Sequence, residues 1–285
     1  MTLIVAAIVV LYNPNNTVID HINTYINDVD IVFAVDNSDQ KKTSIIERLL
    51  KNSKIYYIDN HGNQGIANAL NIGSRNAINM GYKWLLTMDQ DSHFASNILT
   101  KMLDYIQTRE TSNISIIAPF HANKYHLISP SHDLYSPVLT TMTSGNLLNL
   151  EVYTKIGGFI EDLFIDYVDN EYCLRSNLLG FKIIQINHAI LNHNLGDLRR
   201  HQFLWKRFFS TNHGPIRRYY AFRNRFRIIE MYKTHFQDYC SFEKTRFIVD
   251  IIIILLYERE KWAKFKMMMR GYLDYKRGIF GKYYD

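Results

Sequence analysis

The chain has 285 residues, which is enough for one large domain or for a domain with a helical appendage. Its 47% apolar and 21% charged residues predict a globular protein with a sizeable core, and no long polar or low-complexity tract indicates disorder. The net charge of +6 divides unevenly, since residues 1–198 hold 13 Lys/Arg and 19 Asp/Glu (−6), whereas residues 199–285 hold 20 and 8 (+12). The basic C-terminal part predicts a partner with negative charge: nucleic acid, phospholipid or a phosphorylated acceptor.

The N-terminal residues 3–11 form an apolar run with no basic residue before it. The run is shorter than the ~20 residues of a membrane span, so it predicts a buried strand and neither a leader nor an anchor. We therefore expect a cytoplasmic protein, with the inner face of the cell membrane as a second location. Cys173 and Cys240 are too few for a disulfide framework, and we expect both to be small buried hydrophobic residues.

Strand and helix patterns alternate from this point. The apolar segments that predict strands end at Leu11, Asp36, Asp59 and Asp89, and helical spacing predicts helices over residues 17–28, 44–50 and 66–78. This alternation predicts an α/β fold with a doubly wound, Rossmann-like, mostly parallel sheet and helices on both faces. Ligands of such sheets bind outside the carboxyl ends of the strands, which is where Asp36, Asp89 and Asp91 fall.

The next hundred or so residues continue the pattern less regularly. Residues 95–107 and 170–179 predict helices, and residues 114–118 and 181–186 predict strands. Residues 120–143 are rich in Ser, Thr and His, and we expect them to form a loop or hairpin excursion at the rim of the ligand-binding edge.

Beyond residue 198 the character of the chain changes. Residues 199–285 carry Arg, Lys and aromatic residues at helical spacing, so we expect a domain of residues 1–198 followed by a basic helical region. The apolar residues 247–257 are too few for a confident membrane span and are interrupted by Asp250. A peripheral contact with a membrane surface and self-association are the two roles that this composition leaves open.

Two carboxylates flank one residue in Asp89-Gln90-Asp91, directly after an apolar strand. An oxygen-rich pair of this kind can hold a hard divalent cation such as Mg²⁺ or Mn²⁺. The cation can bridge a diphosphate and neutralise the negative charge that builds when it leaves. A solvated loop or a helix cap is the alternative, and the position at a strand end favours the metal.

A second acidic cluster runs from Asp166 to Glu171. Asp169 falls near the start of a predicted helix, where the helix dipole favours a carboxylate. A carboxylate within hydrogen-bond reach of an acceptor hydroxyl can act as its general base. The alternatives are that Asp169 caps the helix and that Glu171 pairs with Arg175 four residues on.

Several motifs follow one another in a recognisable order. They are Val9–Pro14, Val35–Ser38, Asn63–Gly73, Asp89–Asp91, Ser144–Asn146, Gly157–Phe159, Asp169–Arg175 and His193. Together they resemble the family 2 inverting glycosyltransferases of the GT-A fold, over roughly residues 3–198. Phe164–Glu171, Leu191–Gly196 and Pro215–Asn224 are similar to the bacterial rhamnosyltransferase subgroup, which builds O-antigen and capsule chains from dTDP-L-rhamnose. Related galactofuranosyltransferases share much of this pattern.

The resemblance implies where a nucleotide-sugar donor binds. The donor-binding residues that it implies are Leu11, Tyr12, Asp36, Asn63, Gly65 and Asp89. Many family members have two acidic residues where this chain has Asp36-Asn37, so the nucleoside contact is expected to differ in detail.

The resemblance also implies the chemistry. Asp89 and Asp91, together with His193, would hold the metal, and Asp169 would be the general base; His188 has no such support. The acceptor-side residues that it implies are Gly145, Asp166 and Glu171. The implied reaction is an inverting transfer of L-rhamnose to a glycan or lipid-linked glycan acceptor.

Other functions fit fewer of these residues. A galactofuranosyl- or other hexosyltransferase of the same family is the nearest alternative. A metal-dependent nucleotidyltransferase would need a Gly-rich triphosphate loop after the first strand, which the sequence does not have. A non-catalytic nucleotide-sugar-binding module would not need the acidic residues and His193 together. The arginines of residues 217–227 interleave with aromatic residues but belong to no recognised nucleic-acid motif, so we expect no nucleic-acid partner.

Overall fold

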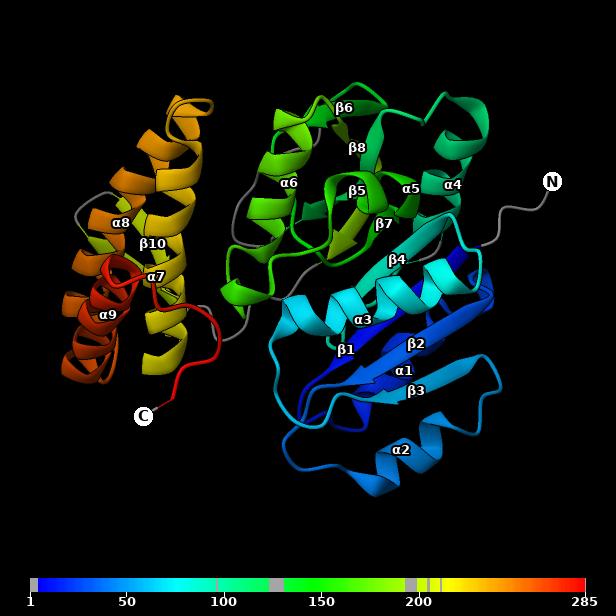
Figure 1. The fold of residues 1–285 in the computed structure, drawn as a ribbon, viewed down its shortest axis with the longest axis horizontal. Coiled ribbons are helices and arrows are strands. Elements are labelled where there is room, and N and C mark those ends of the chain that lie inside the picture. Colours follow the sequence, from blue (N-terminus) through cyan, green and yellow to red (C-terminus); the bar gives the residue numbers. More distant parts are fainter. Residues whose placement is uncertain are drawn as a thin grey trace. The chain divides into compact units, whose positions relative to one another are not determined.

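The computed structural model describes residues 5–95, 97–122, 131–192, 199–203, 206–210 and 212–284 (Figure 1). The chain divides into two compact units. The N-terminal unit comprises Met1–Glu161 and Asp169–Asn194, and the C-terminal unit comprises Asp162–Val168 and Leu195–Asp285. The short segment Asp162–Val168 therefore leaves the first unit and belongs with the end of the chain.

The N-terminal unit contains an eight-stranded sheet of order β3-β2-β1-β4-β7-β5-β8-β6. Its strands are β1 (Val5–Leu11), β2 (Ile31–Asp36), β3 (Ile55–Asp59), β4 (Trp84–Asp89), β5 (Ile114–Ala122), β6 (Tyr135–Val138), β7 (Asn146–Asn149) and β8 (Lys182–Asn192). The pairs β1–β2, β1–β4, β2–β3 and β5–β8 are parallel, and β6 and β7 are antiparallel to their partners. The predicted α/β fold with a mostly parallel sheet is confirmed.

Helices cover both faces of this sheet (Figure 1). They are α1 (Thr17–Asn23), α2 (Thr43–Leu49), α3 (Ile66–Asn79), α4 (Ile98–Thr108), α5 (Leu150–Ile156) and α6 (Val168–Leu178), with 3-10 turns η1 (Ile26–Asp28) and η2 (Glu161–Leu163). The odd-numbered side chains of β1 pack with α1, α2 and α4 in the main core, whereas Ile8 faces α3 on the other side. This alternation follows from the two-residue period of a strand.

The structure departs from the predicted elements where strands are short or irregular. The excursion over residues 120–143 contains β6, and its residues 123–130 lie outside the described residues. β7 and α5 were not predicted, because a four-residue strand carries too little periodicity to be recognised. β8 continues to Asn192, six residues beyond the predicted strand end.

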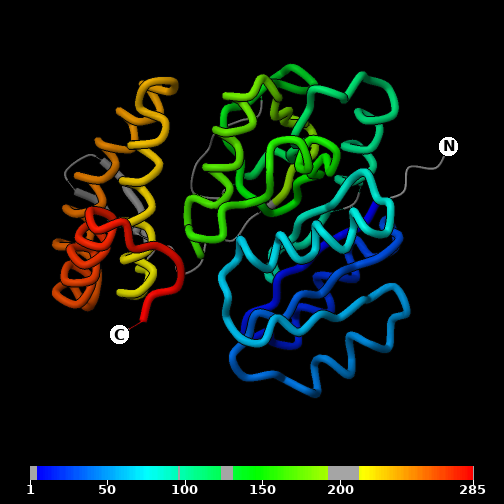
Figure 2. The backbone as a smooth tube through the Cα atoms, in the orientation of Figure 1, coloured from blue at the N-terminus to red at the C-terminus, as the bar shows by residue number. Residues whose placement is uncertain are grey.

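The C-terminal unit contains the hairpin β9 (Arg199–Phe203) and β10 (Lys206–Ser210), followed by α7 (Pro215–Tyr232), α8 (Gln237–Tyr257) and α9 (Lys261–Lys276). Figure 2 traces the chain through these three helices to the C-terminus. The prediction of helical structure from residue 199 onward is wrong for residues 199–203 and 206–210, which form the two strands of the hairpin. Strands of five residues carry too little periodicity to be recognised in the sequence. The helix begins only at Pro215, whose fixed φ suits a first helical position.

Buried ion pairs hold these helices together. Arg218 and Lys264 both pair with the buried Glu258, at 2.5 and 3.0 Å. Arg225 pairs with Glu243 at 3.1 Å and with Asp250 at 2.6 Å. Much of the arginine-rich segment in α7 therefore supports the unit from within, which weakens its interpretation as a nucleic-acid contact. Among the helices of the described residues, none has the length and apolar character that crossing a membrane would require.

We expect Gly73→Ala to destabilise the fold by about 1–3 kcal/mol, because overpacking a buried site displaces its neighbours. A Cβ at Gly73 would lie 2.1 Å from Cδ1 and 2.8 Å from Cγ1 of Ile8. Ile8 is fully buried and β-branched, so it has little freedom to move. Urea unfolding measures the effect. Asn79→Ala, at an exposed position of the same helix, is the matched control; equal stability of the two variants would contradict close packing of α3 on β1.

Candidate active site

The carboxyl ends of β1, β2 and β4 lie side by side. Leu11 pairs in register with Asp36 across β1 and β2, and Val10 pairs with Asp89 across β1 and β4. Because these strands are parallel, the residues that follow them meet at one edge of the sheet. The structure thus brings together Leu11, Asp36 and Asp89, which are predicted donor-side residues, with Tyr12 next to Leu11.

Gln90 connects two of these strand ends and was not predicted as a site residue. Its Oε1 accepts a hydrogen bond from the Tyr12 N–H at 2.9 Å, and its Nε2 donates to the Tyr12 carbonyl at 3.0 Å. The Gln90 carbonyl accepts from Nδ1 of His21 at 2.9 Å. The residue between the two carboxylates of Asp89-Gln90-Asp91 therefore fixes their turn against the chain that follows β1.

Asp36 is buried, and both of its carboxylate oxygens accept hydrogen bonds from other groups of this chain. Its Oδ1 accepts from the Ser38 N–H at 2.9 Å, and its Oδ2 accepts from the Tyr57 hydroxyl at 2.8 Å. Burial, together with the hydrogen bond to Asp36, raises the pKa of Tyr57, so this hydroxyl remains a donor at neutral pH. Asp36 thereby fixes the loop after β2, and its predicted contact with a nucleoside stays a prediction.

Asn37 stands where many members of the resembled family have a second acidic residue, and its amide makes hydrogen bonds in the structure. Its Oδ1 accepts from Asn60 Nδ2 at 2.8 Å and from the Gln64 N–H at 2.9 Å, and its Nδ2 donates to Asn63 Oδ1 at 3.1 Å. A carboxylate has no N–H and would lose the last of these bonds. Asn63 Oδ1 also accepts from the Gly65 N–H at 3.0 Å, so the predicted nucleotide-proximal turn is fixed by Asn37.

A row of amides extends from this turn along α3. Asn68 and Asn71 each donate to Glu161, both at 2.8 Å. Burial opposes the charge of Glu161, but these bonds and Arg75 outweigh it, and the pKa of Glu161 is lowered. Asn71 also accepts from the Phe159 N–H at 2.9 Å. The Asn63–Gly73 and Gly157–Phe159 motifs, far apart in sequence, are therefore joined in the fold.

The proposed metal ligands are partly described. Asp89 ends β4, is half-buried, and its N–H donates to Ser144 Oγ at 3.3 Å. Asp91 lies in the following turn and is exposed. Two carboxylates on a fixed turn suit a hard divalent cation. His193 lies outside the described residues, and within the part of the chain that is described no three His, Cys, Asp or Glu gather as a metal site. The pairing of Asp91 with His193 stays a prediction.

Gly145 occupies a position that only glycine suits. Its φ is +82°, and an added Cβ would lie 2.8 Å from Cδ2 of Leu191 and 3.0 Å from Cγ of Pro119. Its N–H donates to the Thr87 carbonyl at 2.7 Å. The Ser144-Gly145 turn therefore packs directly on β4, two residues before Asp89. Its place on the acceptor side stays a prediction.

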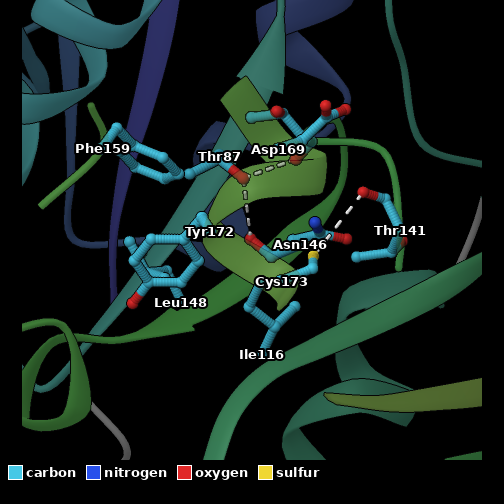
Figure 3. Close-up of a pocket in the computed structure, with 10 residues that line it drawn as sticks. Thr87, Ile116, Thr141, Asn146, Leu148, Phe159, Asp169, Tyr172 and Cys173 are labelled. Atoms are coloured by element: carbon cyan, nitrogen blue, oxygen red, sulfur yellow. Dashed lines mark hydrogen bonds between the residues drawn. The ribbon is translucent and has the colours of Figure 1, made fainter. Parts of the chain in front are cut away.

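Asp169, the predicted general base, lies in the first turn of α6 and lines a small pocket with Thr87 and Cys173 (Figure 3). The free volume of about 10 Å³ has room for about one water molecule, so this pocket supports Asp169 and does not hold a sugar. Thr87 and Asp89 lie on the same face of β4, about 7 Å apart along the strand. Asp169 Oδ1 also accepts from the Asn170 N–H at 2.8 Å, so its carboxylate contributes to the helix start as well.

Glu171 has the structural role that the sequence offered as an alternative. It is fully buried, and Arg175 donates to both of its carboxylate oxygens at 2.9 Å. Arg175 also donates to the carbonyls of Ile156, Gly157 and Gly158 at 2.6 to 3.0 Å. Glu171 therefore ties α6 to the end of α5, and its burial does not suit a contact with an acceptor.

The C-terminal unit holds the segment that precedes Asp169. Phe164, Asp166 and Tyr167 have φ values of 63°, 63° and 65°, an uncommon backbone region for residues other than glycine. Asn224 Nδ2 donates to the carbonyls of Leu163, Ile165 and Asp166 at 2.7, 2.8 and 3.0 Å. Arg223 donates to the carbonyls of Asp162 and Leu163 at 3.1 and 3.3 Å. Side chains of α7 thus hold a strained turn, which is typical of functional segments.

The side chains of this turn are held as well. Asp166 forms a two-pronged ion pair with Arg217, with the shortest contact at 2.8 Å. The Tyr167 hydroxyl donates to Glu243 and accepts from Arg225. The predicted acceptor-side role of Asp166 is compatible with its partial exposure, but its first partner is Arg217. These contacts could not be predicted from the sequence, because the partners are more than fifty residues apart.

We expect Asn224→Ala to destabilise the C-terminal unit by about 2–4 kcal/mol, because buried carbonyls of the strained turn would lose their donor. The side chain of Asn224 is fully buried, so water cannot replace it. Met231→Ala, at an exposed position of the same helix, is the control. Urea unfolding followed by circular dichroism measures both, and a loss within about 0.5 kcal/mol of the control would contradict the proposed support of the turn.

The comparisons with known proteins agree with this geometry. The sequence model of the family described as Glycosyl transferase family 2 matches residues 6–162. The chain is 28% identical to the dTDP-rhamnosyl transferase RfbF of Shigella flexneri, over 96% of this chain and 96% of that protein.

Solved structures share the architecture at low sequence identity. The S. aureus TarS complex with UDP-GlcNAc gives a TM-score of 0.63 at 13% identity, over 97% of this chain and 82% of that one. The mannosyltransferase PcManGT from Pyrobaculum calidifontis, in complex with GDP-Man and Mn²⁺, gives 0.62 at 13% identity, over 96% and 82%. GalNAc-T7 with UDP, GalNAc and Mn²⁺ also gives 0.62 at 13% identity, over 84% of this chain and 49% of that one.

At such identities the solved structures establish a fold, and that fold is GT-A. The sequence model of the family covers more than half of the 285 residues, including the strand ends that meet at one edge of the sheet. The chain therefore belongs to glycosyl transferase family 2.

Proposed function

We propose that the protein transfers L-rhamnose from dTDP-L-rhamnose to a glycan or polyprenyl-linked acceptor in polysaccharide synthesis, with inversion at the anomeric carbon. The observation that carries the proposal is the meeting of the ends of β1, β2 and β4 at one sheet edge, with Asp169 beside β4. The choice of sugar is supported by the relative RfbF, a dTDP-rhamnosyl transferase that aligns over 96% of both chains.

The donor nucleotide would lie along this edge. The backbone after Leu11 and the turn from Asn63 to Gly65 would contact the nucleoside, and Gly65, with φ of +89°, allows a close backbone approach. The hydrogen bonds of Gln90 and Asn37 hold these two contact regions in place before the donor arrives. Such pre-organisation lowers the cost of ordering the site on binding.

Asp169 would take the proton of the acceptor hydroxyl. The acceptor oxygen then forms a bond to the anomeric carbon on the face opposite the diphosphate, while the bond from that carbon to the diphosphate oxygen breaks. The proton ends on the Asp169 carboxyl group, and dTDP leaves with the bonding electron pair. Inversion follows because the bond forms on one face and breaks on the other.

Asp89 and Asp91, with His193, would hold a divalent cation, either Mg²⁺ or Mn²⁺. Carboxylate oxygens on a turn fixed by Gln90 fit such a cation. When bound, the cation supplies positive charge against the diphosphate of the leaving group. Asp166 and Gly145 would lie on the acceptor side.

We expect Asp169→Asn to lower kcat by about 10²–10⁴-fold, since an amide cannot take the proton. The dissociation constant for dTDP-L-rhamnose should change less than about twofold, because the base contacts the acceptor and not the nucleotide. Asp104→Asn, at an exposed carboxylate of α4, is the control for charge. A fully active Asp169→Asn variant would remove the assignment of the base.

We expect dTDP-L-rhamnose to raise the melting temperature more with Mn²⁺ than without it, and more than UDP-galactofuranose does under the same conditions. At 100-fold excess over Kd a ligand contributes about 2.7 kcal/mol, which corresponds to several degrees for a chain of this size. Asp91→Asn should lose the Mn²⁺-dependent part of the shift. A larger shift with the UDP sugar would overturn the choice of donor, and an unchanged shift in Asp91→Asn would overturn the metal ligand.

A further inference from the structure

Helix α8 exposes an apolar stripe to solvent. Its members are Phe242, Ile248, Val249, Ile252, Leu255 and Leu256, and the most exposed are Phe242 at 61%, Ile248 at 58% and Leu256 at 56%. At about 100° per residue these six positions fall within an arc of about 140° on one side of the helix. Thr245 is the exposed polar residue in this arc between Phe242 and Ile248. An exposed apolar face of this kind usually marks an interaction surface.

The stripe is not the face by which α8 packs in its own unit. That packing uses Ile254, which is buried in a cluster with Phe222 and Met268, with Phe247 and Ile251 packed against it. The buried Glu243 on the same side pairs with Arg225. The helix therefore has two apolar faces, of which one holds the unit together and the other remains at the surface.

Cations border the stripe on both sides. By helical position Lys244 lies next to Leu255 at one edge, and Arg246 lies next to Phe242 at the other. Both cations are exposed, and Arg246 also approaches the buried Glu243, with a shortest contact of 3.8 Å. Arg259, Lys261 and Trp262, which is 80% exposed, follow at the end of α8.

The exposed acids near the stripe are fewer. They are Asp238, one turn before the stripe, and Glu260, after it. Glu258 is buried and already pairs with Arg218 and Lys264. The border of the stripe is therefore positive.

The charge of this border decides between two partners. A second copy of the chain, docked stripe to stripe, would bring two positive borders together, which like-charge repulsion opposes. An anionic lipid surface offers apolar acyl chains to the stripe and negative headgroups to its border. Tryptophan suits the boundary between the two, because it is apolar with one polar end. Helices with an apolar face and a basic border bind membranes in this way.

We propose that the α8 stripe, together with Trp262, docks onto an anionic lipid surface, with Lys244 and Arg246 at the headgroups. The apolar side chains enter the boundary between headgroups and acyl chains, and the helix lies in the plane of the surface. This surface belongs to the C-terminal unit, and its docking does not depend on which sugar the protein transfers.

The test is flotation of the full chain with phosphatidylcholine vesicles that contain about one third phosphatidylglycerol, and with pure phosphatidylcholine vesicles. We expect binding to the anionic vesicles that weakens as salt rises, since screening reduces the headgroup attraction. Ile252→Glu should lower the partition coefficient at least about tenfold, and the double variant Lys244→Gln/Arg246→Gln should lower it on anionic vesicles only. Leu50→Glu, at an exposed apolar position of the other unit, is the control and should bind like the wild type.

A second measurement separates loss of binding from loss of folding. Brominated lipids should quench part of the tryptophan fluorescence of the wild-type chain, and Trp262→Phe should remove that quenching while the melting temperature stays unchanged. Absence of binding to anionic vesicles, or undiminished binding by Ile252→Glu, would overturn the proposal. A wild-type dimer that Ile252→Glu converts to a monomer, with no vesicle binding by either, would assign the stripe to a second copy and overturn the lipid.

Discussion

The parallel pairing of β1 with both β2 and β4 is the constraint on which the site depends. It places Leu11 beside Asp36 and Val10 beside Asp89, so three loops that are distant in sequence begin at one edge. The hydrogen bonds of Gln90 and Asn37 then fix the loops relative to the strands. A change in register by one residue would turn every side chain to the other face and scatter these residues.

The sequence was sufficient to predict the alternating strands and helices of the N-terminal unit. Apolar runs ending in Asp36 and Asp89 predicted the parallel sheet and the meeting of these strand ends at one edge, because such strands are buried on both faces. The roles of Gln90, Asn37 and Glu161 could not be predicted, because each depends on a partner that only the fold brings near. Gln90 contacts Tyr12 across 78 positions of sequence, and Glu161 contacts Asn71 across 90. β7 and the β9–β10 hairpin were missed because short strands carry little periodicity.

For the basic C-terminal unit, composition predicted an excess of positive charge but not which of its cations are exposed. Residues 199–285, which form most of this unit, carry a net charge of +12 that indicated an anionic partner, yet several of the cations are internal. Arg218, Arg223 and Lys264 are buried, and they bind carboxylates or backbone carbonyls of their own unit. Part of the charge therefore stabilises the helices and the turn before Asp169, whereas Lys244 and Arg246 are exposed at the border of the α8 stripe.

The most direct test of the central claim is a crystal structure of the Asp169→Asn variant with dTDP-L-rhamnose and Mn²⁺. We expect the nucleotide along the carboxyl ends of β1, β2 and β4, and an anomalous manganese peak near Asp91. We also expect the substituted side chain to face the anomeric carbon from the side opposite the diphosphate. A nucleotide bound elsewhere, or manganese distant from Asp91, would contradict the account.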